Sequence, residues 1–213
     1  MHIKQFRTGG DRNFGYLAAD MSSKEALIVD PSYTPEVIVE YARERHFKIK
    51  YIFSTHGHHD HTEGNAVIER LTNTKPLLFK DRDPITRRRV TDGATFPVGE
   101  MNAIIIHTPG HTKDSICIYI DDALFSGDTL FVGKVGGTDF SRGARKEFDS
   151  LHKKILILPG KTRIFPGHDY GIMPESTIAN ERMTNPFLLQ PNFKSFVHLK
   201  RNWTAYKKEH GIP

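Results

Sequence analysis

Short apolar runs separated by turn-forming residues characterise the first half of the chain. Ala26 to Val29 ends at Asp30, and Ile49 to Phe53 ends before a run of histidines, so both runs predict buried strands. Two more strands, His2 to Arg7 and Phe14 to Ala19, flank the turn sequence T-G-G-D-R-N. Helices are expected where Pro35 follows Thr34 and over residues 63–71, with a short strand over residues 76–79.

The second half repeats this mixture of strands and helices. The predicted strands are Ala103 to Ile106, Ser115 to Ile120, Ala123 to Phe125 and Arg163 to Phe165. The predicted helices are Arg145 to Leu156, Pro174 to Arg182 and the amphipathic tail Phe193 to Lys208. Strands interleaved with helices in both halves predict two packed sheets with helices outside them.

The composition narrows the class of protein. The longest apolar stretches, Ala103 to Ile106 and Ile155 to Leu158, are four residues long, whereas a membrane helix needs about 18. The charged first dozen residues leave no room for the apolar part of a signal peptide. Because Cys117 is the only cysteine, no intrachain disulfide forms, and we expect a reducing, cytoplasmic location with Cys117 as a buried, inert thiol. The net charge of +5 mildly favours anionic partners.

Four of the chain's twelve histidines lie in one short stretch, which has the pattern of a metal site. Residues 55–61 read T-H-G-H-H-D-H, directly after a predicted strand. In an extended segment, residues two apart point to the same side, so His56, His58 and Asp60 share a side while His61 points elsewhere. Imidazole and carboxylate are ligands for zinc, iron or manganese, and such a loop can supply two adjacent ions.

A metal site needs more ligands than one loop supplies, and three later segments offer them. His111 ends H-T-P-G-H, Asp128 lies in S-G-D-T and His168 in P-G-H-D-Y-G, each beside a glycine and after a predicted strand. Alone, each residue is typical of a turn. Together with the first cluster, they predict loops that converge on one metal-binding pocket.

These residues, in this order, resemble the metallo-β-lactamase superfamily. Within it the chain is similar to the glyoxalase II and persulfide dioxygenase branch, through T-P-G-H-T, F-S-G-D-T-L-F, P-G-H-D-Y and T-N-P-F-L. The resemblance implies an α+β fold, a four-layer αββα sandwich with a short C-terminal helical tail. We therefore expect a metallo-β-lactamase-like domain over residues 1–190 and an amphipathic helix packed on it over residues 191–213.

The resemblance also implies which side chains bind metal. One ion would be held by His56, His58 and His111, the second by Asp60, His61 and His168, with Asp128 bridging them. Asp30 would support a ligand from behind, and His59 has no metal role.

The resemblance favours an enzyme that hydrolyses thioesters such as hydroxyacylglutathione-like substrates. Two divalent ions, zinc first and iron or manganese as alternatives, would lower the pKa of a bound water and supply hydroxide at neutral pH. Asp60 would be the catalytic residue that orients this nucleophile. A thiolate leaving group needs no strong general acid.

A second reading is a mononuclear Fe(II) persulfide dioxygenase, which oxidises sulfur with His56, His111 and Asp128 as its iron ligands. The stretch G-G-T-D-F over residues 136–140 resembles a G-R-T-D-F motif of that group and of short bacterial glyoxalase II-like proteins, with Gly137 in place of the arginine.

Two further classes are disfavoured. A metal-dependent nuclease finds support only in the basic run Arg82 to Arg89, which we interpret as a solvated helix face, and 213 residues leave no room for an RNA-binding module. A non-catalytic metal protein would need about four ligands rather than seven.

The expected partner is therefore a small thioester or thiol-derived molecule, with no membrane and no nucleic acid; the oligomeric state stays open. By resemblance Tyr170 would contact the substrate. Lys134, Thr138 and Arg142, in the segment after Asp128, are candidates to line the pocket.

Overall fold

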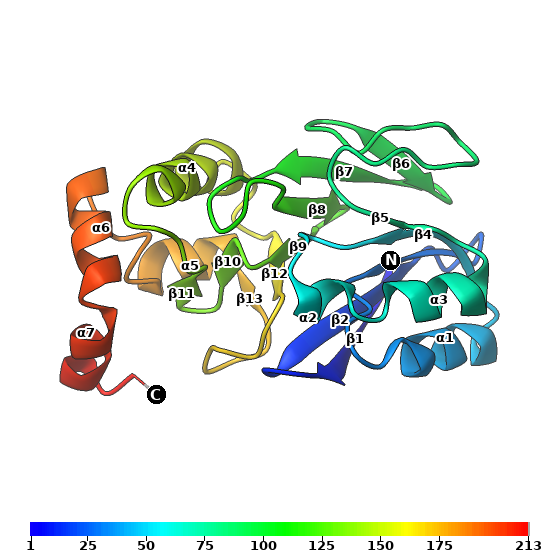
Figure 1. The fold of residues 1–213 in the computed structure, drawn as a ribbon, viewed down its shortest axis with the longest axis horizontal. Coiled ribbons are helices and arrows are strands. Elements are labelled where there is room, and N and C mark those ends of the chain that lie inside the picture. Colours follow the sequence, from blue (N-terminus) through cyan, green and yellow to red (C-terminus); the bar gives the residue numbers. More distant parts are fainter. Residues whose placement is uncertain (213) are drawn as a thin grey trace.

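The computed structural model describes residues 1–212 and contains two mixed β-sheets with helices on their outer sides (Figure 1). The first sheet has the order β1 (His2–Gly9), β2 (Asn13–Ala19), β3 (Glu25–Val29), β4 (Lys48–Phe53), β5 (Pro76–Leu77). β1 to β3 pair antiparallel, whereas β3, β4 and β5 pair in parallel. Parallel neighbours need crossover connections, and α1 (Pro35–Glu44), α2 (His59–Thr62) and α3 (Asn65–Thr72) lie in them.

The second sheet is built from the rest of the chain. Its order is β13 (Ser176–Thr177), β12 (Arg163–Pro166), β9 (Ala123–Gly127), β8 (Ile116–Ile120), β7 (Met101–His107), β6 (Thr95–Val98). Its β9 and β12 are parallel, and the other pairs are antiparallel. Beside the sheet lie the hairpin β10 (Leu130–Phe131) and β11 (Lys134–Val135), α4 (Arg142–Ser150), a π-helical turn (Leu151–Ile155), α5 (Ile178–Thr184), α6 (Phe193–Arg201) and α7 (Trp203–His210).

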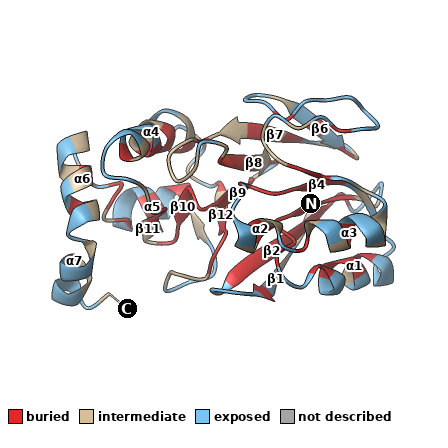
Figure 2. Ribbon diagram, viewed as in Figure 1, coloured by how far each residue is buried: buried red, intermediate tan, exposed pale blue. Residues whose placement is uncertain are grey.

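Alternation along the strands produces four layers. In β3, Leu27 and Val29 belong to the core between the sheets, whereas Ala26 and Ile28 pack with the cluster under α1 and α3. In β8, Ile118 faces the core between the sheets while Cys117 faces the cluster covered by α4 and α6. Figure 2 shows this burial in the strands, with the outer helices largely exposed. The predicted α+β fold with an αββα sandwich is confirmed.

The same topology brings the candidate ligands to one edge of the sandwich. Asp30 follows β3 and His56 follows β4, and these two strands are parallel neighbours. Asp128 follows β9 and His168 follows β12, which are also parallel neighbours. Because parallel strands end at the same edge of a sheet, each pair of loops emerges side by side.

Some predicted helices have different limits in the structure. The tail over residues 193–208 forms two helices, because Asn202 leaves helical geometry and its side chain donates to the carbonyl of His198 at 2.8 Å. The helix predicted from Pro174 begins at Ile178, where Thr177 caps it. The helix predicted from Arg145 begins at Arg142 and runs into the π-helical turn.

The basic run Arg82 to Arg89 is not helical. It forms a turn closed by a bridge between Arg82 and Arg89, and Arg88 and Arg89 donate to backbone carbonyls. Residue 213, the end of the predicted C-terminal segment 191–213, lies outside the described residues. No helix in the described part of the chain is both long and apolar enough to span a bilayer.

Candidate metal centre

The loop after β4 presents its ligands in two directions. His58 is extended, with φ −66° and ψ 147°, and α2 begins at the next residue. His56 and His58 therefore lie on the extended part, as the spacing predicts, while Asp60 and His61 lie in the helical turn. Asp60 lies near His61 rather than near His56 and His58, because the helical turn changes the direction of its side chain.

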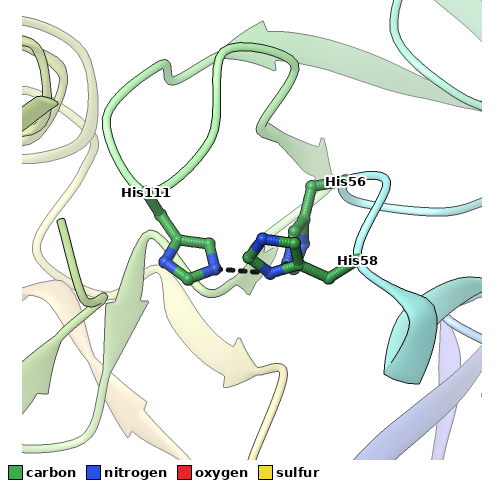
Figure 3. Close-up of side chains that lie close together, drawn as sticks. All are labelled: His56, His58 and His111. Carbon is green, nitrogen blue, oxygen red and sulfur yellow. Dashed lines mark hydrogen bonds between the residues drawn. The ribbon is translucent and has the colours of Figure 1, made fainter.

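The first group of possible ligands is formed by His56, His58 and His111. The Nδ1 atom of His58 lies 2.9 Å from Nε2 of His56 and 3.0 Å from Nε2 of His111. Figure 3 shows the three rings converging from two loops that are far apart in the sequence. His56 is buried and His58 is exposed, so this group opens toward solvent.

The second group is formed by Asp60, His61 and His168, with Asp128 beside both groups. Nε2 of His61 and Nε2 of His168 are 3.3 Å apart, and Oδ2 of Asp60 lies 3.3 Å from the latter. Asp128 places Oδ1 at 3.3 Å from Nε2 of His61 and Oδ2 at 3.5 Å from Nε2 of His111. The structure thus brings all seven predicted ligands together.

Outer hydrogen bonds fix the orientation of the rings. Nδ1 of His61 lies 2.9 Å from the Asp30 carboxylate, which also accepts from the backbone N–H and hydroxyl of Thr55. Nδ1 of His111 donates to the carbonyl of Gly137 at 2.7 Å, and Nδ1 of His168 donates to the carbonyl of Asp11 at 2.8 Å. Outer partners of this kind are typical of metal-binding histidines, since they direct the other ring nitrogen inward.

This donor arrangement fits divalent cations. With their outer nitrogens donating, His61 and His168 direct their Nε2 lone pairs at each other over 3.3 Å, and His111 directs its own toward Nδ1 of His58 over 3.0 Å, as ligands around a cation do. Asp128 Oδ1 is buried and has no hydrogen-bond partner in the described residues. Imidazole and carboxylate suit zinc, iron or manganese and do not select among them.

The pKa shifts of the clustered side chains show where negative charge concentrates. Burial opposes protonation of His61, but the charges of Asp30 and Asp128 raise its pKa well above the ordinary value. The pKa of His168 is raised to about 9, because the negative charges of Asp128 and Asp60 outweigh the effect of burial. In contrast, burial and the neighbouring His61 lower the pKa of His56 to about 2. The Asp60 and Asp128 side of the cluster is therefore the strongly negative side.

A cavity of about 510 Å³ adjoins the second group. Tyr170 lines it and stacks on His168 with ring centroids 4.7 Å apart. Arg12 and Lys134 also line it, with their cationic groups 4.9 and 4.5 Å from the centre of the Tyr170 ring. Burial and the nearby charge of Lys207 lower the pKa of Lys134, as expected in an excess of positive charge.

The four predicted substrate contacts separate into two pairs. Tyr170 and Lys134 line the cavity, whereas Thr138 and Arg142 are not among its lining residues. Arg142 begins α4 and is exposed, so closeness to Asp128 in the sequence does not bring it to the cavity. A larger hollow of about 920 Å³ lies along α6 and α7. None of the seven ligands lines either space, but the smaller cavity is connected to the cluster through Tyr170 and Asp11, which both contact His168.

Sequence reasoning missed the contribution of the turn between β1 and β2. This turn supplies Arg12 to the cavity and the Asp11 carbonyl to His168, and Asn13 Nδ2 donates to Asp60 Oδ2 at 3.0 Å. A backbone carbonyl has no side-chain signature, and the turn reads as an ordinary hairpin connection. Only its Asp-Arg-Asn composition offered a signal.

Comparison with known proteins agrees with this geometry. The sequence profile of the metallo-beta-lactamase superfamily matches residues 8–85 and 74–168. The cytoplasmic isozyme of hydroxyacylglutathione hydrolase from Saccharomyces cerevisiae is 32% identical over 79% of this chain and 68% of its own length. The human mitochondrial persulfide dioxygenase ETHE1 is 31% identical over 92% of this chain and 79% of its own length.

A solved structure gives the same result for the fold. The crystal structure of ETHE1 from Myxococcus xanthus superposes with a TM-score of 0.85 at 29% identity, covering 95% of this chain and 91% of that one. The profile match covers more than half of the chain, and relatives above 30% identity extend over most of it. The chain belongs to the metallo-β-lactamase superfamily.

Proposed function

We propose that this protein is a binuclear metal-dependent hydrolase of thioesters with an anionic thiol part, such as hydroxyacylglutathione-like substrates. The observation that carries the proposal is the second ligand group. Asp60, His61 and His168 lie together beside Asp128, in addition to the three histidines of the first group. A centre with one metal would leave that group of buried, inward-directed rings without a role.

The proposed ligand sets follow the two groups. His56, His58 and His111 would hold one cation, Asp60, His61 and His168 the other, and Asp128 would bridge them. Zinc is our first choice, and iron or manganese suits the same donors. When bound, such cations lower the pKa of water toward neutrality and polarise a carbonyl group.

The protein's own groups orient the reactants. Asp60 Oδ2 accepts from Asn13 and remains partly exposed, so it can accept a hydrogen bond from the attacking water. Tyr170 donates its hydroxyl to Asp11 at 2.6 Å and presents its ring to the cavity. The thiolate that leaves is stable at neutral pH, so the site needs no buried acid to protonate it.

The cavity supports an anionic substrate. Its volume lies within the range typical of small-molecule sites, and Arg12 and Lys134 place two cations one aromatic ring away from His168. A substrate whose carboxylates lie between these cations would place its reactive carbon toward the ligand cluster. This separation of binding and reacting ends suits a glutathione-like thioester.

A persulfide dioxygenase is the second candidate, because a named persulfide dioxygenase matches 92% of this chain at nearly the same identity as the hydrolase. It would use His56, His111 and Asp128 around a single iron. His111 Nε2 lies 3.5 Å from Asp128 Oδ2, which is compatible with that set.

The deciding experiment is an assay of one protein preparation with both substrates. Metal-free protein is reloaded with zinc or, without oxygen, with Fe(II), and is offered S-lactoylglutathione or glutathione persulfide. The proposal predicts release of thiol from the thioester with no oxygen consumed. Oxygen uptake with the persulfide, seen only with iron and without thioester cleavage, would replace it by the dioxygenase.

A further inference from the structure

A buried ion pair lies behind His111, on the side away from the other ligands. Lys200 of α6 contacts Glu147 of α4, and their side chains are only 5% and 1% exposed. The Lys200 ammonium also donates to the backbone carbonyl of Gly136 at 2.5 Å. Because removing two charges from water offsets most of their attraction, a buried pair is a poor source of stability. Its presence calls for another role.

Two contacts connect the pair to His111. On one side, the carbonyl of Gly137 accepts from Nδ1 of His111, and Lys200 holds the adjacent carbonyl of Gly136. On the other side, Gly110 precedes His111 and packs directly on Glu147. A Cβ atom at Gly110 would lie 2.5 Å from the Cα atom of Glu147, so only glycine permits this approach. Both the ring and the backbone of His111 therefore rest on structure that Glu147 and Lys200 fix.

Each member of the pair depends on the other. Burial raises the pKa of Glu147 to about 7 and lowers the pKa of Lys200, while each charge opposes the shift of its partner. Oε1 of Glu147 is buried and has no hydrogen-bond partner among the described residues. Loss of Lys200 would leave a buried carboxyl group uncompensated and the Gly136 carbonyl without its donor.

We propose that Lys200 and Glu147 are positioning residues, through which the C-terminal helix α6 sets the ring of His111 for cation binding. Neither residue touches the ligand cluster, so the effect acts through the segment Gly136–Gly137. The effect falls on the group His56, His58 and His111, since this segment accepts the hydrogen bond of the His111 ring. The group Asp60, His61 and His168 is held by Asp30 and Asp11 instead. This inference extends the proposed function and rests only on its cation binding.

The test titrates metal-free, full-length protein with Co²⁺ and follows its visible spectrum. Lys200→Met should weaken one of two cobalt equivalents by about 10–100-fold, the usual effect of losing an outer partner, and leave the other unchanged. Leu199→Ala is the matched control, because Leu199 is a buried core residue of the same helix and lies in the adjacent position. It should lower the melting temperature but retain both equivalents.

A double variant separates positioning from stability. Lys200→Met with Glu147→Leu removes both charges, so a fold that needs only packing here is largely preserved. If the pair positions His111, the double variant should still bind one of its two cobalt equivalents weakly, because the Gly136 carbonyl still lacks its donor. Lys200→Arg, which keeps a donor, should recover part of the affinity. Wild-type affinity in the double variant, or weakening by Leu199→Ala in proportion to its lower melting temperature, would overturn the inference.

A measurement without metal keeps this test separate from the proposed function. Amide hydrogen exchange of the segment 136–143 should be faster in metal-free Lys200→Met than in metal-free Leu199→Ala. Failure of the wild-type protein to bind cobalt would contradict the proposed function alone if this exchange difference were present. Equal exchange in the two variants would contradict the positioning role.

Discussion

The two halves of the ligand cluster are held in different ways. His61 and His168 are fully buried, and their outer nitrogens face the Asp30 carboxylate and the Asp11 carbonyl. His58 is exposed, and His111 is held by one carbonyl of a loop. The half with His61 and His168 includes a carboxylate of its own, Asp60, whereas the half with His56, His58 and His111 contains three histidines.

This contrast between the halves connects the number of bound metal ions to the two candidate functions. The half with Asp60 is negative, and it attracts cations and protons alike, as the raised pKa of His168 shows. The half with His58 and His111 faces the solvent and depends on loop geometry. A hydrolase with two cations needs both halves, whereas a dioxygenase with one iron would use only His56 and His111 with Asp128.

The largest effect on activity is expected from removing the carboxylate ligand of the negative half. Asp60→Ala should lower thioester turnover by more than about 100-fold, since loss of a direct ligand exceeds the 10–100-fold effect of an outer partner. His59→Ala is the control, because His59 lies on the same loop, pairs with Glu63 and has no predicted metal role. Steady-state assays measure both. Near-normal thioester turnover in Asp60→Ala would contradict a catalytic role for the cation of this half.

A smaller effect is expected behind His61. Asp30→Asn weakens the acceptor that directs the ring, so cation affinity should fall about 10–100-fold on the Asp60 half and little on the other. Competition with a coloured chelator measures the two affinities separately. An equal fall at both equivalents would mean that the halves are not held independently.

The metal-free protein should lose stability as the pH rises. The pKa of His168 is about 9 in the folded chain against 6.5 ordinarily, so its contribution is complete below pH 6.5 and is lost as the pH passes 9. Urea unfolding of chelator-treated protein at pH 6 and pH 9.5 should differ by about 3 kcal/mol from this group, since one pKa unit corresponds to about 1.4 kcal/mol. His168→Gln removes the group, and an unchanged pH dependence in that variant would refute the assignment.

The smallest effect concerns substrate binding beside the negative half. Arg12→Ala should raise KM about fivefold with kcat unchanged, as expected for a charge that contacts substrate and transition state equally. Arg87→Ala, an exposed arginine of the basic turn, is the matched control and should change nothing. A fall in kcat at constant KM would place Arg12 in the chemical step instead.

The sequence predicted the candidate metal ligands better than the groups that hold those ligands in place. The loop 55–61 follows a buried strand and carries adjacent ligands, and His111, Asp128 and His168 lie at strand ends, where loops converge. The supports of these ligands are backbone carbonyls of Asp11 and Gly137, which any residue could supply. Lys200 and Glu147 are 53 positions apart on separate helices, so no local pattern connects them.

The fold shows the same division between regular patterns and long-range contacts. Alternation in β8 predicted its two faces, whereas β10 and β11 are two residues each and carry no periodicity. The break at Asn202 divides a tail whose apolar spacing continues across it. Thr138 and Arg142 were assigned to the pocket by their position in the sequence alone, and α4 begins at Arg142 outside the cavity lining.

If both halves bind a cation, the number of metal ions per chain must be two. Protein purified without oxygen or chelators is analysed for metal content, and metal-free protein is then titrated with Zn²⁺ in a calorimeter. We expect two equivalents of Zn²⁺ per chain in the wild-type protein and one in Asp60→Ala. A single equivalent in the wild-type protein, unchanged by Asp60→Ala, would contradict it.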